Sequence, residues 1–357
     1  MIRLDGSLHS GSGTLLRYAA ALATLTKTPV HMVRIRSRRP RPGLRAQHLQ
    51  ALRACASLCS GQLEGDEVGS QEIYYQPGPT LEGGDFHWDV GTAGSTTMIA
   101  FTVLPVAVFA PVACRFTITG GLFQDFAPSA FHMQKVLLPL LETMGVRAQL
   151  EVVRPGYYPE GKGILRMTVA PGPPSLAPLS LEQQGTIREI RGIALASHLE
   201  RERVAERIAV RCRELLEREG WSSTIRITND GTAVRKGAAL VLWGESDTGC
   251  RWGADRAGKK GRRSEDLASH AVGSILEDLR SGACTDRYTA DQLILFCAVA
   301  RGTSQYRIPR VTEHVQSNRW LVQTILGVES RLSGNLLTIE GGGLQRGVAQ
   351  LGAGVVK

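Results

Sequence analysis

Long apolar runs are absent from this sequence. No run reaches the roughly 18 to 20 residues that a membrane-spanning helix requires. The longest candidate, residues 98–112, is interrupted by Thr102, Pro105 and Pro111. The N-terminal residues also lack the basic region and the apolar segment of a secretory signal peptide. These two absences predict a chain without membrane spans and with a cytoplasmic location.

A cysteine framework is lacking as well. The seven cysteines are an odd number, and they are scattered without regular spacing. Cys55 and Cys59 are four residues apart in a helical pattern, which stacks them on one helix face and does not form a metal knuckle. We expect free thiols in a reducing compartment and no zinc site.

What the chain does contain is an excess of positive charge that is unevenly placed. The 357 residues are 43% hydrophobic and 21% charged, which is typical of a globular protein, and the net charge is +9. Pro40, Pro42 and Gly43 hold one basic cluster in a rigid loop, which favours a polyanionic partner. A second cluster fits a solvated surface equally well. The two clusters are Arg34, Arg36, Arg38, Arg39, Arg41 and Arg45, and Lys259, Lys260, Arg262 and Arg263.

Two loops of small residues precede predicted helices. Residues 5–13 connect a predicted strand at 2–4 to a helix at 14–25, and residues 91–95 precede an apolar helix at 97–110. The order strand, glycine-rich loop, helix is a phosphate-binding arrangement in principle. The first loop matches neither the dinucleotide fingerprint nor the P-loop with its lysine.

The predicted elements recur along the chain. Strands and helices repeat with a period near 90 residues, which indicates duplicated α/β modules. The proline-rich residues 171–179 predict a connector, and residues 185–283 are more charged than the rest. We therefore expect an α/β fold with a large domain at 1–184 and 284–357 and a smaller inserted domain at 185–283.

A histidine near the C-terminus stands next to a predicted helix start. Ser317 and Asn318 precede an apolar helical pattern, and either is a suitable N-cap. That places His314 in the turn before the helix, where the backbone N–H groups favour anions. A lone histidine in such a place fits a structural role as well as a role in phosphate chemistry.

Several blocks of residues together resemble the RNA 3′-terminal phosphate cyclase family. The most specific block runs from Arg36 through Arg39 and Pro42-Gly43-Leu44 to Gln47-His48-Leu49, and the order of all blocks covers nearly the whole chain. The remaining matches are Leu4-Asp5-Gly6-Ser7, Gly11, Gly13, Leu16-Arg17, Gly94-Ser95, Gly120-Gly121, Ala127-Pro128, Gly156-Tyr157-Tyr158-Pro159, Tyr288, Asp291-Gln292-Leu293, Glu313-His314 and Ser317-Asn318.

This resemblance implies a fold and a reaction. The fold is a large domain of three repeated βαβαββ modules with a smaller α/β insert. In the reaction, a histidine at the position of His314 attacks the α-phosphate of ATP, and the AMP then passes to the 3′-phosphate of an RNA end. The vicinal 2′-hydroxyl closes a 2′,3′-cyclic phosphate and releases AMP. ATP, a divalent metal (Mg²⁺ or Mn²⁺) and RNA 3′-phosphate ends are therefore the implied cofactors and substrate, with no membrane partner.

The resemblance also implies roles for individual residues. His314 is the expected nucleophile, and Arg17, Arg36 and Arg39 are the expected catalytic cations, because guanidinium groups match phosphate oxygens. Asp291 is expected to orient the histidine or to help hold the metal. The residues expected to bind ATP or its phosphates are Gln47, Tyr288, Asp291, Gly11, Gly13, Thr14, Phe101 and Pro128.

Three positions depart from the family pattern. Ser10 stands where an acidic residue accompanies the metal, and Thr14 and Phe101 stand where glutamines are common. A hydroxyl is a much weaker ligand for a hard cation than a carboxylate. Two hypotheses follow: an active cyclase with an altered metal site, or a non-catalytic relative that binds RNA ends. A third hypothesis is an enolpyruvyl transferase, which uses similar repeated modules. The C-terminal Glu-His motif gives this hypothesis no support. The oligomeric state stays open.

Overall fold

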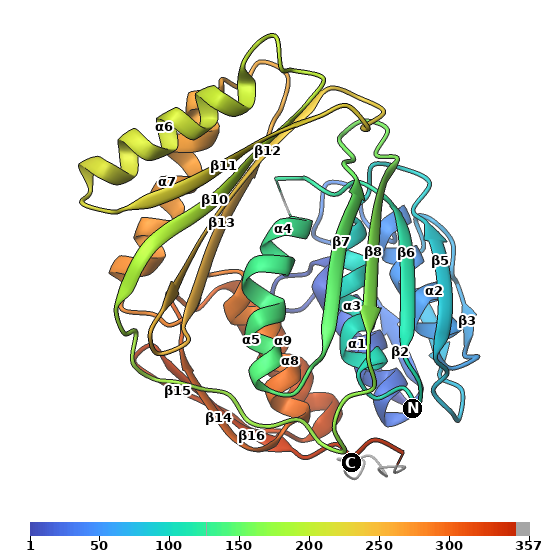
Figure 1. Ribbon diagram of the computed structural model, residues 1–357. Coiled ribbons are helices and arrows are strands. Elements are labelled where there is room, and N and C mark those ends of the chain that lie inside the picture. Colours follow the sequence, from blue (N-terminus) through green and yellow to red (C-terminus); the bar gives the residue numbers. More distant parts are fainter. Residues whose placement is uncertain (126, 348–357) are drawn as a thin grey trace.

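The computed structural model describes residues 1–125 and 127–347 as a mixed α/β protein (Figure 1). Four sheets of four strands each carry the described helices. Three of the sheets have the same strand order along the chain, and the fourth is formed by residues 187–257. The expected α/β class is therefore confirmed.

The first sheet has the order β1-β2-β4-β3, with β1 parallel to β2 and the other pairs antiparallel. Helix α1 connects the parallel pair, and every one of its residues is buried. Such a helix is apolar on all sides because it lies inside the molecule. The elements of this sheet are β1 (Ile2–Asp5), α1 (Gly13–Thr26), β2 (Val30–Val33), α2 (Ala46–Ser57), β3 (Gln62–Glu64) and β4 (Ile73–Gln76).

The second sheet repeats this order as β5-β6-β8-β7, again with only the first pair parallel. Its second connection is one helical run with a single wide π turn, η1, which the sequence did not predict. The elements are β5 (Gly84–Asp89), α3 (Thr96–Ala107), β6 (Cys114–Gly120), α4 (Ala130–His132), η1 (Met133–Leu137), α5 (Leu138–Thr143), β7 (Ala148–Arg154) and β8 (Gly163–Val169).

The third sheet has the order β9-β14-β16-β15. Strand β9 pairs in parallel with β14, although more than one hundred residues separate them in the chain. The elements are β9 (Ser180–Leu181), α8 (Thr289–Val299), β14 (Arg301–Arg307), α9 (Glu313–Leu326), β15 (Ser330–Ser333) and β16 (Leu336–Gly342).

The fourth sheet is formed by the residues between β9 and α8, in the order β11-β10-β12-β13. Helices α6 and α7 cover one of its faces (Figure 1). Ile208, Cys212 and Leu216 recur on the buried side of α6, as its amphipathic pattern predicts. The elements are β10 (Ile187–Ser197), α6 (Val204–Arg218), β11 (Ser223–Asp230), β12 (Gly237–Ser246), β13 (Arg251–Ala257) and α7 (Ser264–Arg280). Strand β13 was not predicted.

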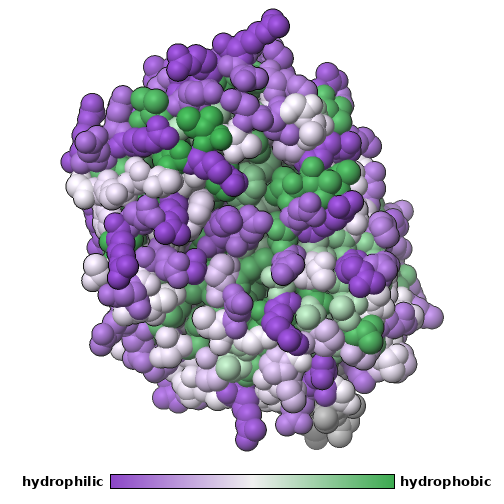
Figure 2. Space-filling view, in the orientation of Figure 1, coloured by the Kyte–Doolittle hydropathy of each residue, from purple (hydrophilic) through white to green (hydrophobic). Residues whose placement is uncertain are grey.

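Helices of the first three sheets pack against one another in the interior. Helix α1 contacts α2, α3 and α9, and α8 contacts α9. The surface is mostly hydrophilic, with hydrophobic residues visible in the hollow between the sheet β10–β13 and the rest of the molecule (Figure 2). All seven cysteines are buried and free, as expected. Within the described ranges no helix is long and apolar enough to cross a membrane.

Candidate active site

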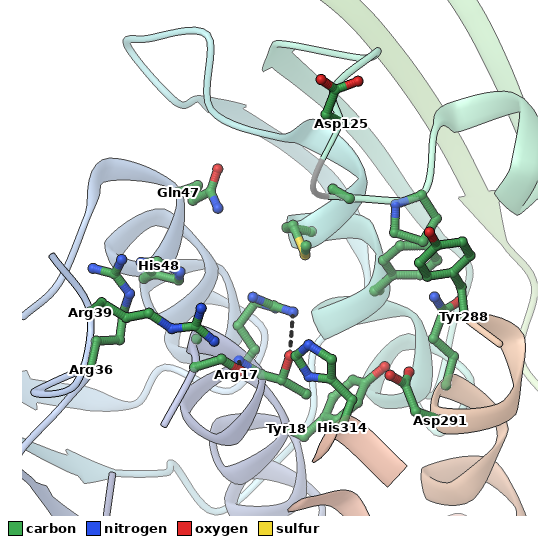
Figure 3. Close-up of a pocket in the computed structure, with 18 of the residues that line it drawn as sticks. Arg17, Tyr18, Arg36, Arg39, Gln47, His48, Asp125, Tyr288, Asp291 and His314 are labelled. Carbon is green, nitrogen blue, oxygen red and sulfur yellow. Dashed lines mark hydrogen bonds between the residues drawn. The ribbon is translucent and has the colours of Figure 1, made fainter. Parts of the chain in front are cut away.

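A cavity of about 450 Å³ lies where helices α1, α8 and α9 begin (Figure 3). It collects side chains that are up to 302 positions apart in the sequence, from Ser12 to His314. The residues that line it are Ser12, Gly13, Thr14, Arg17, Tyr18, Arg36, Arg39, Gln47, His48, Met98, Phe101, Asp125, Ala127, Pro128, Asp255, Tyr288, Asp291, Gln292 and His314.

The start of α1 packs closely against His48. The Ser12 hydroxyl caps the helix by accepting from the Thr14 backbone N–H. A Cβ added at Gly13 would lie 2.2 Å from Nε2 of His48, so only glycine allows this approach. Burial, reinforced by the charges of Arg17, Arg36 and Arg45, lowers the pKa of His48 to about 2. This imidazole is therefore a neutral part of the wall.

Arg17 supplies a buried cation at the cavity. Its side chain is 5% exposed, and Nη2 donates to the Thr14 hydroxyl at 3.3 Å. Its Nε is buried and has no hydrogen-bond partner within residues 1–125 and 127–347. A buried guanidinium with an unused N–H is energetically unfavourable unless an anion binds it. Arg17 is thus prepared for an anionic ligand.

The arginine loop contributes two further cations. Arg36 adopts a left-handed backbone (φ +52°), and its Nη1 donates to the carbonyls of Gly43 at 2.6 Å and Arg41 at 3.0 Å. Arg39 donates from Nη2 to the Ser10 carbonyl at 3.2 Å. Carbonyl groups orient these guanidinium groups without neutralising them. Gln47 is held nearby, because its Oε1 accepts from the Ser95 N–H at 2.9 Å.

The helix that carries His314 begins earlier than the sequence predicted. Thr312 is the N-cap of α9, and its hydroxyl accepts from the Val315 N–H at 3.2 Å. The prediction that Ser317 or Asn318 is the N-cap was wrong, because both lie inside the helix. The Ser317 hydroxyl donates to the Glu313 carbonyl at 2.7 Å, and Asn318 Nδ2 donates to the Asp291 carbonyl at 2.9 Å. The Ser317 hydroxyl thus bonds within its own helix, and the Asn318 amide serves a tertiary contact.

His314 therefore lies in the first turn of α9 and faces the cavity (Figure 3). Burial lowers the pKa of His314 below its usual 6.5, and the charges of Arg17 and Arg39 lower it further, while Glu313 opposes them. Its Nδ1 is buried and has no partner in the described part of the chain. A neutral imidazole with a free nitrogen is a competent nucleophile at pH 7.

Asp291, Tyr288 and Pro128 also line the cavity. Burial raises the pKa of Asp291 to about 8, although Arg17 favours its charged form. At neutral pH this carboxyl is therefore mostly protonated. Tyr288 is 38% exposed and lies away from Arg36 and Arg39 in Figure 3. Phe101, at 4% exposure, completes an apolar wall.

All predicted site residues except Gly11 and Ser10 line the cavity. Ser10 is buried, and its hydroxyl bonds with the hydroxyls of Ser12 at 3.0 Å and Ser317 at 2.8 Å. Gly11 adopts φ +51° and shapes the turn of the loop. The roles predicted for the lining residues stay predictions, since the structure establishes their position.

Sequence reasoning missed two acidic residues of the cavity. Asp125 forms a bidentate ion pair with Arg262 at 2.8 and 2.7 Å. Asp255 lies on the unpredicted strand β13, and its carboxyl accepts from the Ser129 N–H. No motif marked either residue. Within the second basic cluster, Arg262 and Arg263 are engaged in internal ion pairs, the latter with Asp266 at 2.8 Å.

The side chains fit a triphosphate better than a resident metal ion. The three arginines and the unpaired Nε of Arg17 match phosphate oxygens. No group of three or more His, Cys, Asp or Glu side chains in the two described ranges is arranged to hold a metal. The Ser10 hydroxyl is already bonded, and Asp291 is mostly protonated. In the unliganded protein, neither Ser10 nor Asp291 therefore presents an open carboxylate oxygen to a divalent cation.

The cavity of this α/β protein places His314 beside three arginines, a combination of side chains that suits phosphate groups. Residues 8–332 match the family described as RNA 3′-terminal phosphate cyclase. The RNA 3′-terminal phosphate cyclase of Methylococcus capsulatus is 38% identical over 328 residues, which cover 90% of each chain. Those of Methanopyrus kandleri and Archaeoglobus fulgidus are each 37% identical and cover 94% and 95% of this chain, and 96% and 100% of their own lengths. The chain belongs to the RNA 3′-terminal phosphate cyclase family.

A solved structure was also found. The match to the enolpyruvyl transferase NikO from Streptomyces tendae covers 97% of the present chain and 50% of the NikO chain, with 12% sequence identity. The TM-score of 0.42 is too low to indicate a shared function.

Proposed function

We propose that this protein converts RNA 3′-phosphate ends to 2′,3′-cyclic phosphates, using ATP and a covalent adenylyl-histidine at His314. The observation that carries the proposal is the position of His314, whose Nδ1 is unpartnered, in one cavity with Arg17, Arg36 and Arg39. Family membership supports the same reaction class.

The first step is nucleotidyl transfer to the protein. An imidazole nitrogen of His314 attacks the α-phosphorus of ATP, a P–N bond forms, and the bond to the bridging oxygen breaks. Pyrophosphate leaves with the electron pair of that bond, and the imidazole loses its N–H proton. Positioning and charge neutralisation dominate phosphoryl transfer, and the arginines supply both.

The second and third steps act on RNA. An oxygen of the 3′-phosphate attacks the adenylyl phosphorus, the P–N bond breaks, and His314 regains a proton. The 2′-hydroxyl then attacks the 3′-phosphorus, loses its proton, and expels AMP. Covalent catalysis divides a difficult transfer into easier steps.

The remaining lining residues divide between phosphates and base. Gly13 and Thr14 adjoin Arg17, so we assign them, with Gln47, to the phosphates. Tyr288, Pro128 and Phe101 offer apolar surface for adenine. A divalent cation, when it binds, would be held by the phosphates of the nucleotide, and it would neutralise their charge. No step assigned to the protein depends on it.

The architecture is part of the proposal. We propose that β1–β4, β5–β8 and β9 with β14–β16 are three copies of one βαβαββ module, because all three sheets share one strand order. Residues 185–283 would then be an insert within the third copy, and 1–184 with 284–357 the large domain.

The experiment is the conversion of an oligoribonucleotide with a 3′-phosphate. After incubation with ATP and Mg²⁺ or Mn²⁺, the end should become resistant to phosphatase in the wild type and not in His314→Ala. His9→Ala is the matched control, because His9 lies outside the cavity and its ring packs at a tilt against that of Trp320, with centroids 5.3 Å apart. Binding of the RNA without conversion would instead favour the non-catalytic, RNA-binding alternative.

A further inference from the structure

A tryptophan and two cations gather on the face of the sheet β10–β13 that α6 and α7 leave uncovered. Trp243 on β12 pairs with Arg191 on β10, so their side chains share a face. Lys135 of η1 reaches this face, with its Nζ 5.9 Å from the centroid of the Trp243 ring. The π turn of the second sheet thus brings a cation to the fourth sheet.

Arg226 adds a second positive charge to the same face. On β11 it pairs with Ile193, which is two residues from Arg191 and therefore on the same side of β10. Burial lowers the pKa of Lys135, and the charge of Arg226 lowers it further. Within the described ranges, neither Lys135 Nζ nor the Arg226 guanidinium has a hydrogen bond or an ion pair with a protein group. Two neighbouring cations without a counter-ion are stabilised by an anion.

Solvent space is available beside this cluster. A second cavity, of about 510 Å³, is lined by Trp243 and residues around it. Two of its acidic residues are already neutralised: Glu189 pairs with Arg191, and Glu245 pairs with Arg251, each at 2.5 Å. Asp247 and Arg188 also line this cavity, and Asp247 accepts from the Thr186 N–H at 2.8 Å. Lys135 and Arg226 lie outside its lining, on the same face of the sheet as the indole.

The cluster is close to the candidate active site. Trp243 pairs with Gly253, two residues along β13 from Asp255, which lines the first cavity. On the other element, Ser129 donates to Asp255 and precedes Lys135 by six residues, or roughly 9 Å of helix at 1.5 Å per residue. An RNA strand whose 3′ end lies in the first cavity can therefore reach Trp243 within a few nucleotides.

We infer that Trp243, Lys135 and Arg226 form a subsite for one upstream nucleotide of the RNA, with its base on the indole and its phosphate between the two cations. Single-strand binding commonly combines aromatic stacking with a positively charged groove. This inference rests on the proposed function, because that function supplies the RNA strand that occupies the first cavity.

The test measures binding of a decanucleotide and of a dinucleotide, both with a 3′-phosphate, to the full-length protein. Arg226→Glu and Trp243→Leu should each weaken decanucleotide binding about 5-fold or more and leave dinucleotide binding unchanged. Arg226→Glu should also reduce the slope of log K against log salt by about 0.7, the value for one phosphate contact on a single strand.

Arg218→Glu on α6 is the matched control, because it makes the same charge change on the helix that covers the opposite face. Labelling of each variant by α-labelled ATP checks that the first cavity is intact and should equal that of the wild type. Normal labelling with unchanged decanucleotide binding overturns the subsite alone. Absence of label in the wild type overturns the proposed function, and the binding comparison can still be made.

Discussion

The hydroxyls of Ser317 on α9 and Ser10 are hydrogen-bonded at 2.8 Å, a contact that spans 307 positions of the sequence. The backbone N–H of Ser10 donates to Ser317 Oγ at 3.2 Å. The small-residue loop before α1 is thereby fixed to the helix that carries His314. Changes in that loop should be transmitted to the candidate nucleophile.

The variant Ser10→Glu should therefore lower activity. A buried hydroxyl site surrounded by Ser12 and Ser317 has no room for a longer carboxylate, and overpacking of this kind destabilises by about 1–3 kcal/mol. Thermal unfolding and the labelling of the protein by α-labelled ATP measure the two effects. Ser10→Ala, which only removes the hydroxyl, is the control and should be affected less. Strongly increased labelling in Ser10→Glu would show instead that the serine weakens a metal site.

Replacing Arg17 should move the acid limb of the pH–rate profile. The charge of Arg17 helps to lower the pKa of His314, so Arg17→Gln should raise that pKa toward 6.5. With a higher pKa, His314 becomes protonated at a higher pH when the solution is acidified. The acid limb of the curve of labelling rate against pH therefore shifts to higher pH. Loss of a phosphate contact should also reduce the rate about 100-fold or more.

Arg41→Gln is the control for this profile, since Arg41 is exposed in the same loop and lies outside the cavity. An unshifted acid limb in Arg17→Gln would contradict the electrostatic coupling of Arg17 to His314.

Asp291 should make the unliganded protein less stable as the pH rises. Its folded pKa of about 8 lies above the ordinary value of 3.8, so the folded state holds an extra proton between about pH 4 and pH 8. The stability contributed by this proton is present at low pH and is lost as the pH rises through the folded pKa. The Tm of the wild type should fall relative to that of Asp291→Asn between pH 5 and pH 8. Parallel Tm curves for the two proteins would contradict the raised pKa.

Gly13 should tolerate no side chain. In Gly13→Ala the new Cβ would overlap His48, and we expect a loss of about 1–3 kcal/mol in the free energy of unfolding. Gly273→Ala is the matched control, because no atom lies within 4 Å of an added Cβ in the middle of α7. It should be stabilised by about 0.5–1 kcal/mol. Denaturant unfolding of both variants gives the comparison.

Local sequence signals predicted the buried helices correctly, together with most of the strands before residue 155. The apolar runs that became α1, α3 and α8 are strong because these helices are buried on all sides. Strand β13 was missed because its residues, from Arg251 to Ala257, mix charged and small side chains. The carboxyl of Asp255 accepts from the Ser129 N–H, and no local pattern shows a contact 126 positions apart.

Sequence motifs predicted which residues form the candidate site, and the structure corrected the start of the helix that carries His314. Arg17, Arg36, Arg39 and His314 lie in the cavity that the motifs implied. The N-cap of α9 was misplaced because Thr312 takes that role. The Ser317 hydroxyl instead bonds to the Glu313 carbonyl inside the helix and to Ser10, a partner that only the folded chain provides. The protonated state of Asp291 likewise arises from burial, which is a property of the assembled helices.

The central claim is tested most directly by incubating the protein with α-labelled ATP and Mg²⁺ or Mn²⁺ and separating it under denaturing conditions. We predict label on the wild type and on His9→Ala, and none on His314→Ala. The label should be stable to base and labile to acid, as expected for a phosphoramidate. An unlabelled wild type, or label that persists in His314→Ala, would contradict the proposed adenylyl-histidine.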